Sequence, residues 1–189
     1  HRSQVRHLER VAATDHLTGL MNRSELLPAL TRAMADTAES GALLAVAYMD
    51  LDGFKPINDR FGHEVGDVVL QQIARRLRRT FRQNDQLFRV GGDEFVLLIS
   101  DLRNVGLAEQ LLGRMLSKLT RPIEHGGQTL PEVSASLGVV IHPLTDLDGP
   151  EAVLSAADRA MYAAKGAGGA RVHLFDIRHD TASRHRTSG

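Results

Sequence analysis

Two short acidic segments carry the residue types from which a cation-dependent phosphate chemistry can be built. In the first, two glycines are followed directly by Asp93 and Glu94, between the apolar runs Leu87–Val90 and Phe95–Ile99. Both runs are typical of strands, and a Gly-Gly pair between strands predicts a hairpin turn because glycine accepts positive φ without steric cost. The hairpin tip would hold two carboxylates where a ligand can approach the backbone closely. An acidic turn without function is the alternative.

The second acidic segment lies at the end of another predicted strand. The run Leu43–Met49 is apolar and indicates a buried strand, which ends at Asp50, Leu51 and Asp52. Mg²⁺ prefers oxygen ligands and usually takes one or two protein carboxylates together with phosphates and water. If Asp50 and Asp93 lie on adjacent strands, their oxygens can share metal ions. A strand followed by an ordinary acidic turn is the alternative.

Five segments follow one another along the chain in a recognisable pattern. They are DHLTGLMNR at 15–23, DLDGFKPIND at 50–59, FGHEVGD at 61–67, RVGGDEF at 89–95 and ADRAMYAAK at 157–165. In this order and at this spacing they resemble the GGDEF domain, the diguanylate cyclase family. The resemblance covers roughly residues 14 to 176. Because chance does not plausibly deliver five ordered motifs, the chain is identified as a member of this family.

Strands and helices alternate along the chain, which together with one hairpin indicates an α/β fold with a mixed sheet. The resemblance implies a central five-stranded mixed β-sheet surrounded by helices, like the palm of nucleotide cyclases, with the GGDEF motif on a β-hairpin. We expect helices at 23–38, 54–61, 64–81, 107–119 and 150–165, and further strands at 122–124, 133–141 and 172–175. The glycines at 126 and 127 are expected to form the turn between the strands at 122–124 and 133–141.

The resemblance also implies a reaction, in which two GTP molecules are condensed into cyclic di-GMP with release of two pyrophosphates. It assigns catalytic roles to Asp50, Asp93 and Glu94. Asp50 and Asp93 would be carboxylate ligands of Mg²⁺ or Mn²⁺, with the backbone carbonyl of Leu51 as a further ligand. Glu94 would make a second metal contact or help to deprotonate the attacking 3′-hydroxyl. Asp52 would support the site or be a solvated turn residue.

Further positions match the substrate-binding residues of the family. Asn58 and Asp67 match the guanine-reading positions, although the residues alone indicate a capping or turn residue and a helix N-cap. A carboxylate can accept hydrogen bonds from guanine N1–H and N2–H₂ together, and such a site rejects adenine. The phosphates would lie against backbone N–H groups at a helix start, and glycine would let the nucleotide pass the hairpin. The residues for these contacts are Gly53, Phe54, Lys55, Gly92 and the phosphate-binding Lys165.

The chain departs from the family pattern at one position and keeps a further motif. Where the family usually has Arg four residues after the lysine, this chain has Gly169, and Arg171 is the nearest alternative cation. Arg82 and Asp85 match the product-inhibition motif, at which cyclic di-GMP would bind. We therefore expect product inhibition, with weaker GTP binding than is usual for the family.

One site holds one GTP, so the reaction requires a homodimer in which two domains face each other. The expected partners are GTP, cyclic di-GMP and a second copy of the chain. A catalytically weak or inactive regulatory module is the alternative. Such a module would bind GTP or cyclic di-GMP and control an attached domain such as a phosphodiesterase.

Composition limits the other possible functions. Lys and Arg together number 23, as do Asp and Glu, so the zero net charge gives no support for nucleic-acid binding. The absence of cysteine excludes a disulfide framework and a thiolate metal site. No apolar run approaches the length of a membrane span, and no signal peptide is visible. We expect a cytoplasmic location with no direct membrane contact from this segment, and leave open an anchor elsewhere in the full-length protein.

The length of 189 residues fits one domain with its own core. We expect a linker helix at 1–13, a GGDEF domain at 14–176 and a polar tail or linker at 177–189. The linker helix would join an upstream domain and pair in a dimer, with a frayed terminal helix as the alternative. In the helix at 64–81, the arginines at 75, 76, 78 and 79 are expected to form a solvated face, with an interface as the alternative.

Overall fold

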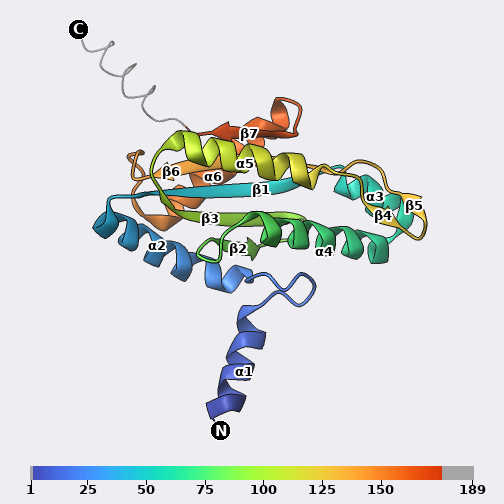
Figure 1. The fold of residues 1–189 in the computed structure, drawn as a ribbon, viewed down its shortest axis with the longest axis horizontal. Helices are drawn as coiled ribbons and strands as arrows, with labels where there is room; N and C mark the ends of the chain where they lie inside the picture. Colours follow the sequence, from blue (N-terminus) through green and yellow to red (C-terminus); the bar gives the residue numbers. More distant parts are fainter. Residues whose placement is uncertain (1, 176–189) are drawn as a thin grey trace.

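The computed structural model describes residues 2–175, which contain one mixed five-stranded sheet (Figure 1). The strand order is β2-β3-β1-β6-β7, and all neighbours are antiparallel except the parallel pair β6 and β7. This arrangement confirms the predicted palm-like α/β fold. The strands are β1 (Leu43–Asp52), β2 (Gln86–Arg89), β3 (Glu94–Leu102), β6 (Ser134–His142) and β7 (Arg171–Leu174).

Helices cover both faces of the sheet, as Figure 1 shows. One hydrophobic cluster joins α4 and α5 to one face, and a second joins α2 and α6 to the other. Since both faces are covered, the central strand is apolar on both sides, which is why its sequence is a continuous apolar run. The helices are α2 (Leu26–Ser40), α3 (Phe54–Phe61), α4 (His63–Thr80), α5 (Val105–Leu119) and α6 (Gly149–Gly166).

The central strand β1 is longer than the sequence indicates. It was predicted to end at Met49, but it continues to Asp52, because its last residues pair with β6, Asp50 opposite Ser136 and Asp52 opposite Ser134. The two aspartates therefore stand on a strand, on one face of the sheet, rather than in a turn.

Several predicted boundaries also move. The helix expected at 23–38 is a 3-10 turn η1 (Arg23–Glu25), capped by the Asn22 side chain, followed by α2. The glycines at 126 and 127 connect β4 (Glu124–His125) to β5 (Gln128–Thr129), which form a separate two-stranded sheet. The prediction that this turn joins the strand at 122–124 to the strand at 133–141 is therefore wrong. Local pairing of two short strands closes the turn before the chain returns to the main sheet.

Helix α6 is held against the sheet by a close approach at Gly138 of β6. A Cβ atom at this position would lie 2.1 Å from the Ala157 carbonyl oxygen and 2.1 Å from the Met161 backbone nitrogen. Only glycine fits this contact without moving the helix. Because Lys165 lies in the last turn of α6, this contact also sets the height of Lys165 above the sheet.

The helix expected at the N-terminus is present as α1 (Arg2–Ala13), and it projects away from the sheet (Figure 1). Val5 and Leu8 on α1 are 45 % and 67 % exposed. In the described part of the chain, 2–175, no helix combines the length and the apolar character needed to cross a membrane. The predicted tail at 177–189 lies outside the described residues.

Candidate active site

The two acidic segments lie side by side at one end of the sheet, as the hairpin model predicts. Asp50 on β1 is directly opposite Glu94 on β3. The backbone N–H of Leu51 donates to the carbonyl oxygen of Asp93 at 3.2 Å, which extends the pairing of the two strands beyond Glu94. The hairpin therefore brings Asp93 close to Asp50 and to the Leu51 backbone.

The burial and electrostatics of Asp50 are those of a cation ligand. Its Oδ1 atom is buried and has no hydrogen-bond partner, and its Oδ2 atom is 3.4 Å from Lys165 Nζ. Burial raises the pKa of Asp50 to about 6; the negative charge of Asp93 adds to the rise and Lys165 opposes it. A buried acceptor beside a second carboxylate is stabilised by a cation that supplies the missing contact.

The donor set fits a hard divalent cation. Asp50, Asp93 and the carbonyl of Leu51 provide only oxygen ligands, as Mg²⁺ and Mn²⁺ prefer. Within residues 2–175, no three His, Cys, Asp or Glu side chains come close enough together to hold a metal ion. Two carboxylates are nevertheless what Mg²⁺ usually takes from a protein when phosphates supply the remaining ligands.

Glu94 is held by a residue that the sequence analysis missed. The Tyr48 hydroxyl donates to Glu94 Oε2 at 3.0 Å. Burial raises the pKa of Tyr48 well above its ordinary value, and the contact with Glu94 raises it further, so Tyr48 remains a hydrogen-bond donor. The two side chains share one face because Tyr48 lies two residues before Asp50, the residue opposite Glu94. The two-residue spacing from Tyr48 to Asp50 is the feature of the sequence from which Tyr48 could have been predicted.

Asp52 is an anchored anion rather than a solvated turn residue. It accepts hydrogen bonds from Ser136 Oγ at 2.8 Å, from Ser134 Oγ at 3.0 Å and from the Ala170 backbone N–H at 2.8 Å. Burial disfavours its ionised form, but these bonds and the contact with Lys165 outweigh burial and hold the pKa of Asp52 below its ordinary value. Asp52 therefore stays charged and holds Lys165, whose Nζ is 3.2 Å from Asp52 Oδ1.

The phosphate cradle was predicted at the start of α3, which follows Gly53 directly. Gly53 has φ +81°, and a Cβ there would lie 2.9 Å from the Glu132 carbonyl oxygen. No side chain caps α3. The first-turn N–H groups at Phe54 and Lys55 are therefore available to an anion, for which a helix N-terminus is favourable.

The predicted guanine-reading residues lie on two adjacent helices. Asn58 lies within α3 and Asp67 within α4, so neither has the capping role that the residues alone indicated. Asn58 Oδ1 is buried without a partner, and a Cβ at Gly66 would lie 1.8 Å from it. Asp67, the residue after Gly66, is exposed. The side chains available for base recognition are thus an unpaired amide oxygen and a solvent-facing carboxylate.

Arg89 fastens the acidic hairpin to the first motif of the chain. Its Nε and Nη2 atoms donate to the Gly92 carbonyl oxygen at 3.1 and 2.9 Å, and its Nη1 atom donates to Asp15 Oδ1 at 3.1 Å. Asp15 also accepts from the backbone N–H and hydroxyl of Thr18. Both residues belong to recognised motifs, but no spacing in the sequence predicts that they pair.

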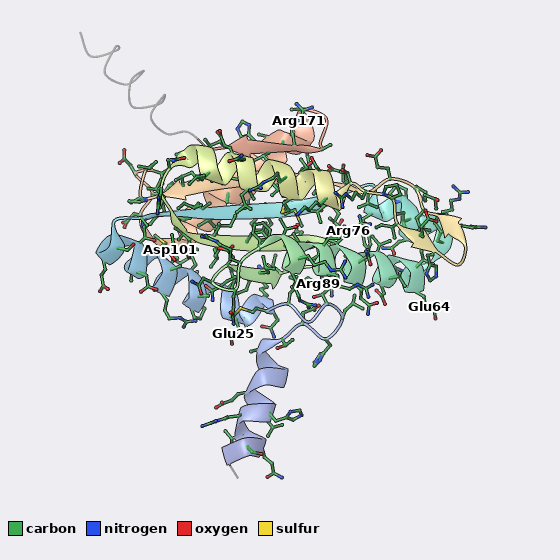
Figure 2. All side chains as sticks on the ribbon, in the orientation of Figure 1. Glu25, Glu64, Arg76, Arg89, Asp101 and Arg171 are labelled. Carbon is green, nitrogen blue, oxygen red and sulfur yellow. The ribbon has the colours of Figure 1, made fainter. Side chains whose placement is uncertain are left out.

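At Gly169, where the family usually carries arginine, a side chain would press on Asp52. Gly169 has φ +72°, and a Cβ on it would lie 2.9 Å from Asp52 Oδ2. Arg171, the nearest alternative cation, donates from Nε to the Gly169 carbonyl oxygen at 3.0 Å and is exposed on β7 (Figure 2).

The two residues matched to product inhibition differ sharply in exposure. The Asp85 side chain is 0 % exposed and accepts from the backbone N–H of Arg82 at 3.0 Å. The Arg82 side chain is 55 % exposed and donates to the Ser100 carbonyl oxygen at 2.7 Å. Arg82 is therefore accessible to a ligand, whereas Asp85 closes the local turn.

The expectation that four arginines of α4 form a solvated face is wrong for Arg76, whereas Arg75, Arg78 and Arg79 are exposed. Arg76 is half-buried between α4 and α5 (Figure 2) and donates to the carbonyl oxygens of Leu119, Arg121 and Pro122 at 2.7–2.9 Å. Arg78 donates to the Thr18 carbonyl oxygen. These carbonyls are distant in sequence, so the helix pattern could not predict the contacts.

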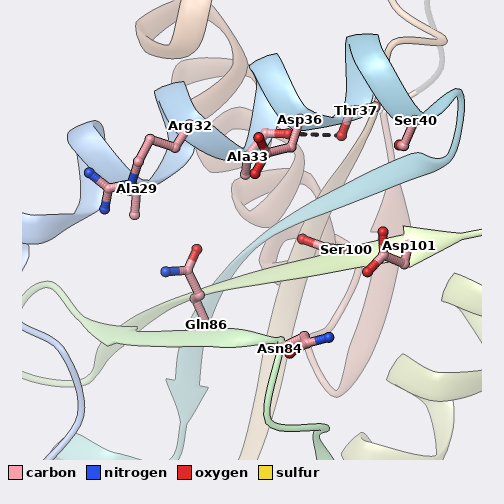
Figure 3. Close-up of a pocket in the computed structure, with 10 residues that line it drawn as sticks. All are labelled: Ala29, Arg32, Ala33, Asp36, Thr37, Ser40, Asn84, Gln86, Ser100 and Asp101. Atoms are coloured by element: carbon pink, nitrogen blue, oxygen red, sulfur yellow. Dashed lines mark hydrogen bonds between the residues drawn. The ribbon is translucent and has the colours of Figure 1, made fainter.

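A polar hollow of about 350 Å³ lies between α2 and the ends of β2 and β3 (Figure 3). Its lining includes Arg32, Asp36, Asn84 and Asp101, but none of the predicted site residues. It is therefore separate from the acidic hairpin.

The comparisons with known proteins agree with this geometry. The family model described as diguanylate cyclase, GGDEF domain, matches residues 12–171. The diguanylate cyclase TpbB of Pseudomonas aeruginosa strain UCBPP-PA14 is 39 % identical over 80 % of this chain and 34 % of TpbB. The bifunctional diguanylate cyclase/cyclic di-GMP phosphodiesterase MucR of P. aeruginosa PAO1 is 37 % identical over 86 % of this chain and 23 % of MucR. The chain thus spans about a third or less of these curated relatives.

A solved structure shows the same fold. The coiled coil and GGDEF domain of DgcB from Caulobacter crescentus, in complex with c-di-GMP, superposes with a TM-score of 0.84 at 28 % identity. The match covers 92 % of this chain and 91 % of that one. Together with the acidic hairpin and the strand beside it, these similarities show that the chain belongs to the diguanylate cyclase GGDEF-domain family.

Proposed function

We propose that this chain is an active diguanylate cyclase that condenses two GTP molecules into cyclic di-GMP and releases two pyrophosphates. The single observation that carries the proposal is the state of Asp50. Its buried Oδ1 lacks a partner beside Asp93 and the Leu51 backbone, in a set of oxygens suited to a divalent cation. Membership of the family and the named activity of TpbB support the proposal.

Asp50, Asp93 and the Leu51 carbonyl would hold Mg²⁺ or Mn²⁺. A bound divalent ion supplies charge neutralisation at the phosphates and lowers the pKa of the attacking 3′-hydroxyl. Glu94, oriented by Tyr48, accepts the proton of that hydroxyl or makes a second metal contact. The first-turn N–H groups of α3 and the ammonium of Lys165 bind the phosphates.

Base recognition falls to Asn58 and Asp67. The carboxylate of Asp67 accepts from guanine N1–H and N2–H₂, and the unpaired Oδ1 of Asn58 accepts a further hydrogen bond from the base. Adenine lacks the N1–H and N2–H₂ donors, so the acceptors would stay unpaired if ATP bound.

In each of two steps, a 3′-oxygen forms a bond to the α-phosphorus of the other nucleotide and pyrophosphate leaves. Each domain holds one nucleotide, so the reaction requires two domains with their sites facing each other. A homodimer is the simplest assembly that supplies them, and specific activity should then rise with protein concentration.

We further propose that cyclic di-GMP inhibits the enzyme by binding at Arg82, whose guanidinium is exposed. Asp85 would take part only if the product displaced the bonds that it accepts from the backbone N–H and the guanidinium of Arg82. The c-di-GMP complex of the related DgcB structure supports product binding as such.

A regulatory module is the second candidate, favoured by Gly169. The missing arginine removes a phosphate contact, and relatives such as MucR combine cyclase and phosphodiesterase activities in one longer protein. In this case the chain would bind nucleotide without turning it over.

The deciding experiment is incubation with GTP and Mg²⁺, with chromatography for cyclic di-GMP. We expect product from the wild type, none from Asp93→Ala and unchanged product from Glu109→Ala, an exposed acidic residue on α5. Absence of product over a wide range of protein concentrations, while GTP still binds, would favour the regulatory module.

A further inference from the structure

The ammonium of Lys165 lies among the oxygens that would bind the metal ion. Lys165 Nζ is 3.4 Å from Asp50 Oδ2, 3.5 Å from the Leu51 carbonyl oxygen and 3.2 Å from Asp52 Oδ1. Two of these three oxygens belong to the metal ligands assigned above. The lysine assigned to phosphate therefore contacts two of the residues assigned to the metal ion.

A divalent ion and this ammonium cannot both keep these contacts. Two cations bound to the two oxygens of the Asp50 carboxylate and to the same Leu51 carbonyl oxygen would lie within a few Å of each other, where their repulsion is strong in a partly buried site. We propose that Lys165 is a built-in substitute for the metal ion, displaced toward the triphosphate when metal and GTP bind. The inference rests on the proposed function, because it uses the metal site assigned there.

The contacts of Lys165 suit displacement. Its approaches to Asp50 and Leu51 are long, and its side chain is 30 % exposed, which gives it a path outward. Asp52 does not depend on it, because two serines and the Ala170 N–H still bind that carboxylate. The site therefore keeps its shape when the ammonium leaves.

A consequence follows for the order of binding. Metal alone must compete with Lys165, and the displaced ammonium has no new partner. When GTP is present, its phosphates receive the ammonium and supply metal ligands as well. Metal and nucleotide should therefore bind cooperatively, and the nucleotide-free protein should bind metal weakly.

The test is a Mn²⁺ titration of the nucleotide-free protein, with free Mn²⁺ measured by electron paramagnetic resonance. We expect Lys165→Gln to bind Mn²⁺ at least about tenfold more tightly than the wild type, since the competing cation is gone. Arg171→Gln, which removes a nearby charge that is not at the metal position, should bind like the wild type. Asp50→Asn in the Lys165→Gln background should abolish the gain.

The outcomes separate the two proposals. Equal or weaker Mn²⁺ binding by Lys165→Gln, or an equal gain in Arg171→Gln, would overturn the displacement while leaving the metal site intact. If none of these proteins bound Mn²⁺ at high Mn²⁺ concentration, with or without GTP, the metal site itself would be overturned and the inference with it.

Nuclear magnetic resonance gives a second readout that does not use a variant. The chain has three lysines, Lys55, Lys118 and Lys165. In protein labelled with ¹³C-lysine, Mg²⁺ together with a non-hydrolysable GTP analogue should shift the Cε signal of Lys165 and leave Lys118, which is exposed on α5, unmoved. An unshifted Lys165 signal at saturation would contradict the displacement.

Discussion

Arg89 and Asp15 lie 74 positions apart, yet their side chains form an ion pair with Nη1 3.1 Å from Oδ1. The two side chains are only 18 % and 19 % exposed, so solvent screens the pair incompletely. The same guanidinium holds the Gly92 carbonyl, one residue before Asp93. The segment that follows α1 is thereby connected to the turn that positions a proposed metal ligand.

The first prediction concerns this clamp. In Arg89→Lys a single ammonium group replaces the planar guanidinium with its several N–H donors, so the hydrogen bonds to Gly92 and Asp15 cannot all be kept. We expect kcat for cyclic di-GMP synthesis to fall about tenfold with a small change in the KM for GTP, because the hairpin tip loosens while the nucleotide cradle is unaffected. Steady-state kinetics measure both quantities.

The control for this variant is Arg79→Lys, which changes an exposed arginine on α4 in the same way. It should leave kcat and KM as in the wild type. An Arg89→Lys enzyme with wild-type kcat would show that the backbone pairing of β2 and β3 positions Asp93 without the clamp.

The second prediction concerns pH. The folded-state pKa of Asp50 is raised to about 6, so the neutral form is the one favoured by folding. The protonated form of Asp50 therefore contributes its full stabilisation below about pH 3.8, the unfolded-state pKa, and this stabilisation is lost as the pH rises through about 6. Metal binding needs the ionised form, so Mn²⁺ affinity should rise over the interval in which this contribution is lost.

Asp50→Asn tests both halves of that statement. Relative to the wild type without metal, it should gain stability on the order of 1 kcal/mol at pH 8 and little at pH 4, once solvent screening is allowed for. It should bind no Mn²⁺. Comparison at each pH cancels the titration of His142, whose pKa is lowered by burial. A variant less stable than the wild type at pH 8 would contradict the assignment.

The sequence was sufficient for the parts of the site that depend on local pattern. The Gly-Gly turn and the apolar runs beside it predict a hairpin, and the hairpin brings Asp93 to Asp50. The helices that follow a 3.6-residue period, such as α4, were also predicted within one or two residues.

Contacts between distant segments could not be predicted in this way. Asp52 was predicted either to support the site or to be a solvated turn residue, and the sequence did not indicate that Ser134 and Ser136 of β6 bind it and extend the strand. The partners of Arg76 are carbonyls at the end of α5, and those of Arg89 lie in the first motif and the hairpin turn. Backbone carbonyls have no signature in the sequence, so only the three-dimensional arrangement shows which arginine reaches them.

The third prediction concerns the base site. In Gly66→Ala the new Cβ would overlap Asn58 Oδ1, so Asn58 must turn away from its present position. We expect GTP affinity to fall several-fold, with a smaller loss for GTP analogues that lack the guanine N2 amino group. Isothermal titration with GTP and with ITP measures the difference.

Gly113→Ala is the matched control, because it makes the same change in α5 where no atom lies within 4 Å of the new Cβ. It should leave nucleotide binding unchanged and stabilise the fold by ~0.5–1 kcal/mol, as alanine is the better helix former. If Gly66→Ala bound GTP as tightly as the wild type does, Asn58 would have no role in binding the base.

The last prediction concerns the departure from the family pattern at residue 169. Gly169→Arg restores the usual residue type, but here the backbone has φ +72° and the Cβ would press on Asp52 Oδ2. Gly126→Arg is the matched control, because Gly126 also has a left-handed backbone, with φ +58°, but no atom lies within 4 Å of its Cβ position. We expect Gly126→Arg to lose about 1–2 kcal/mol from the backbone alone. Gly169→Arg should lose more and bind GTP more weakly, because a displaced Asp52 loses the bonds to Ser136 and the Ala170 N–H that keep the site in shape. Denaturant unfolding and GTP titration of both variants measure this, and tighter GTP binding by Gly169→Arg would show instead that the turn can adopt the conformation that the arginine requires.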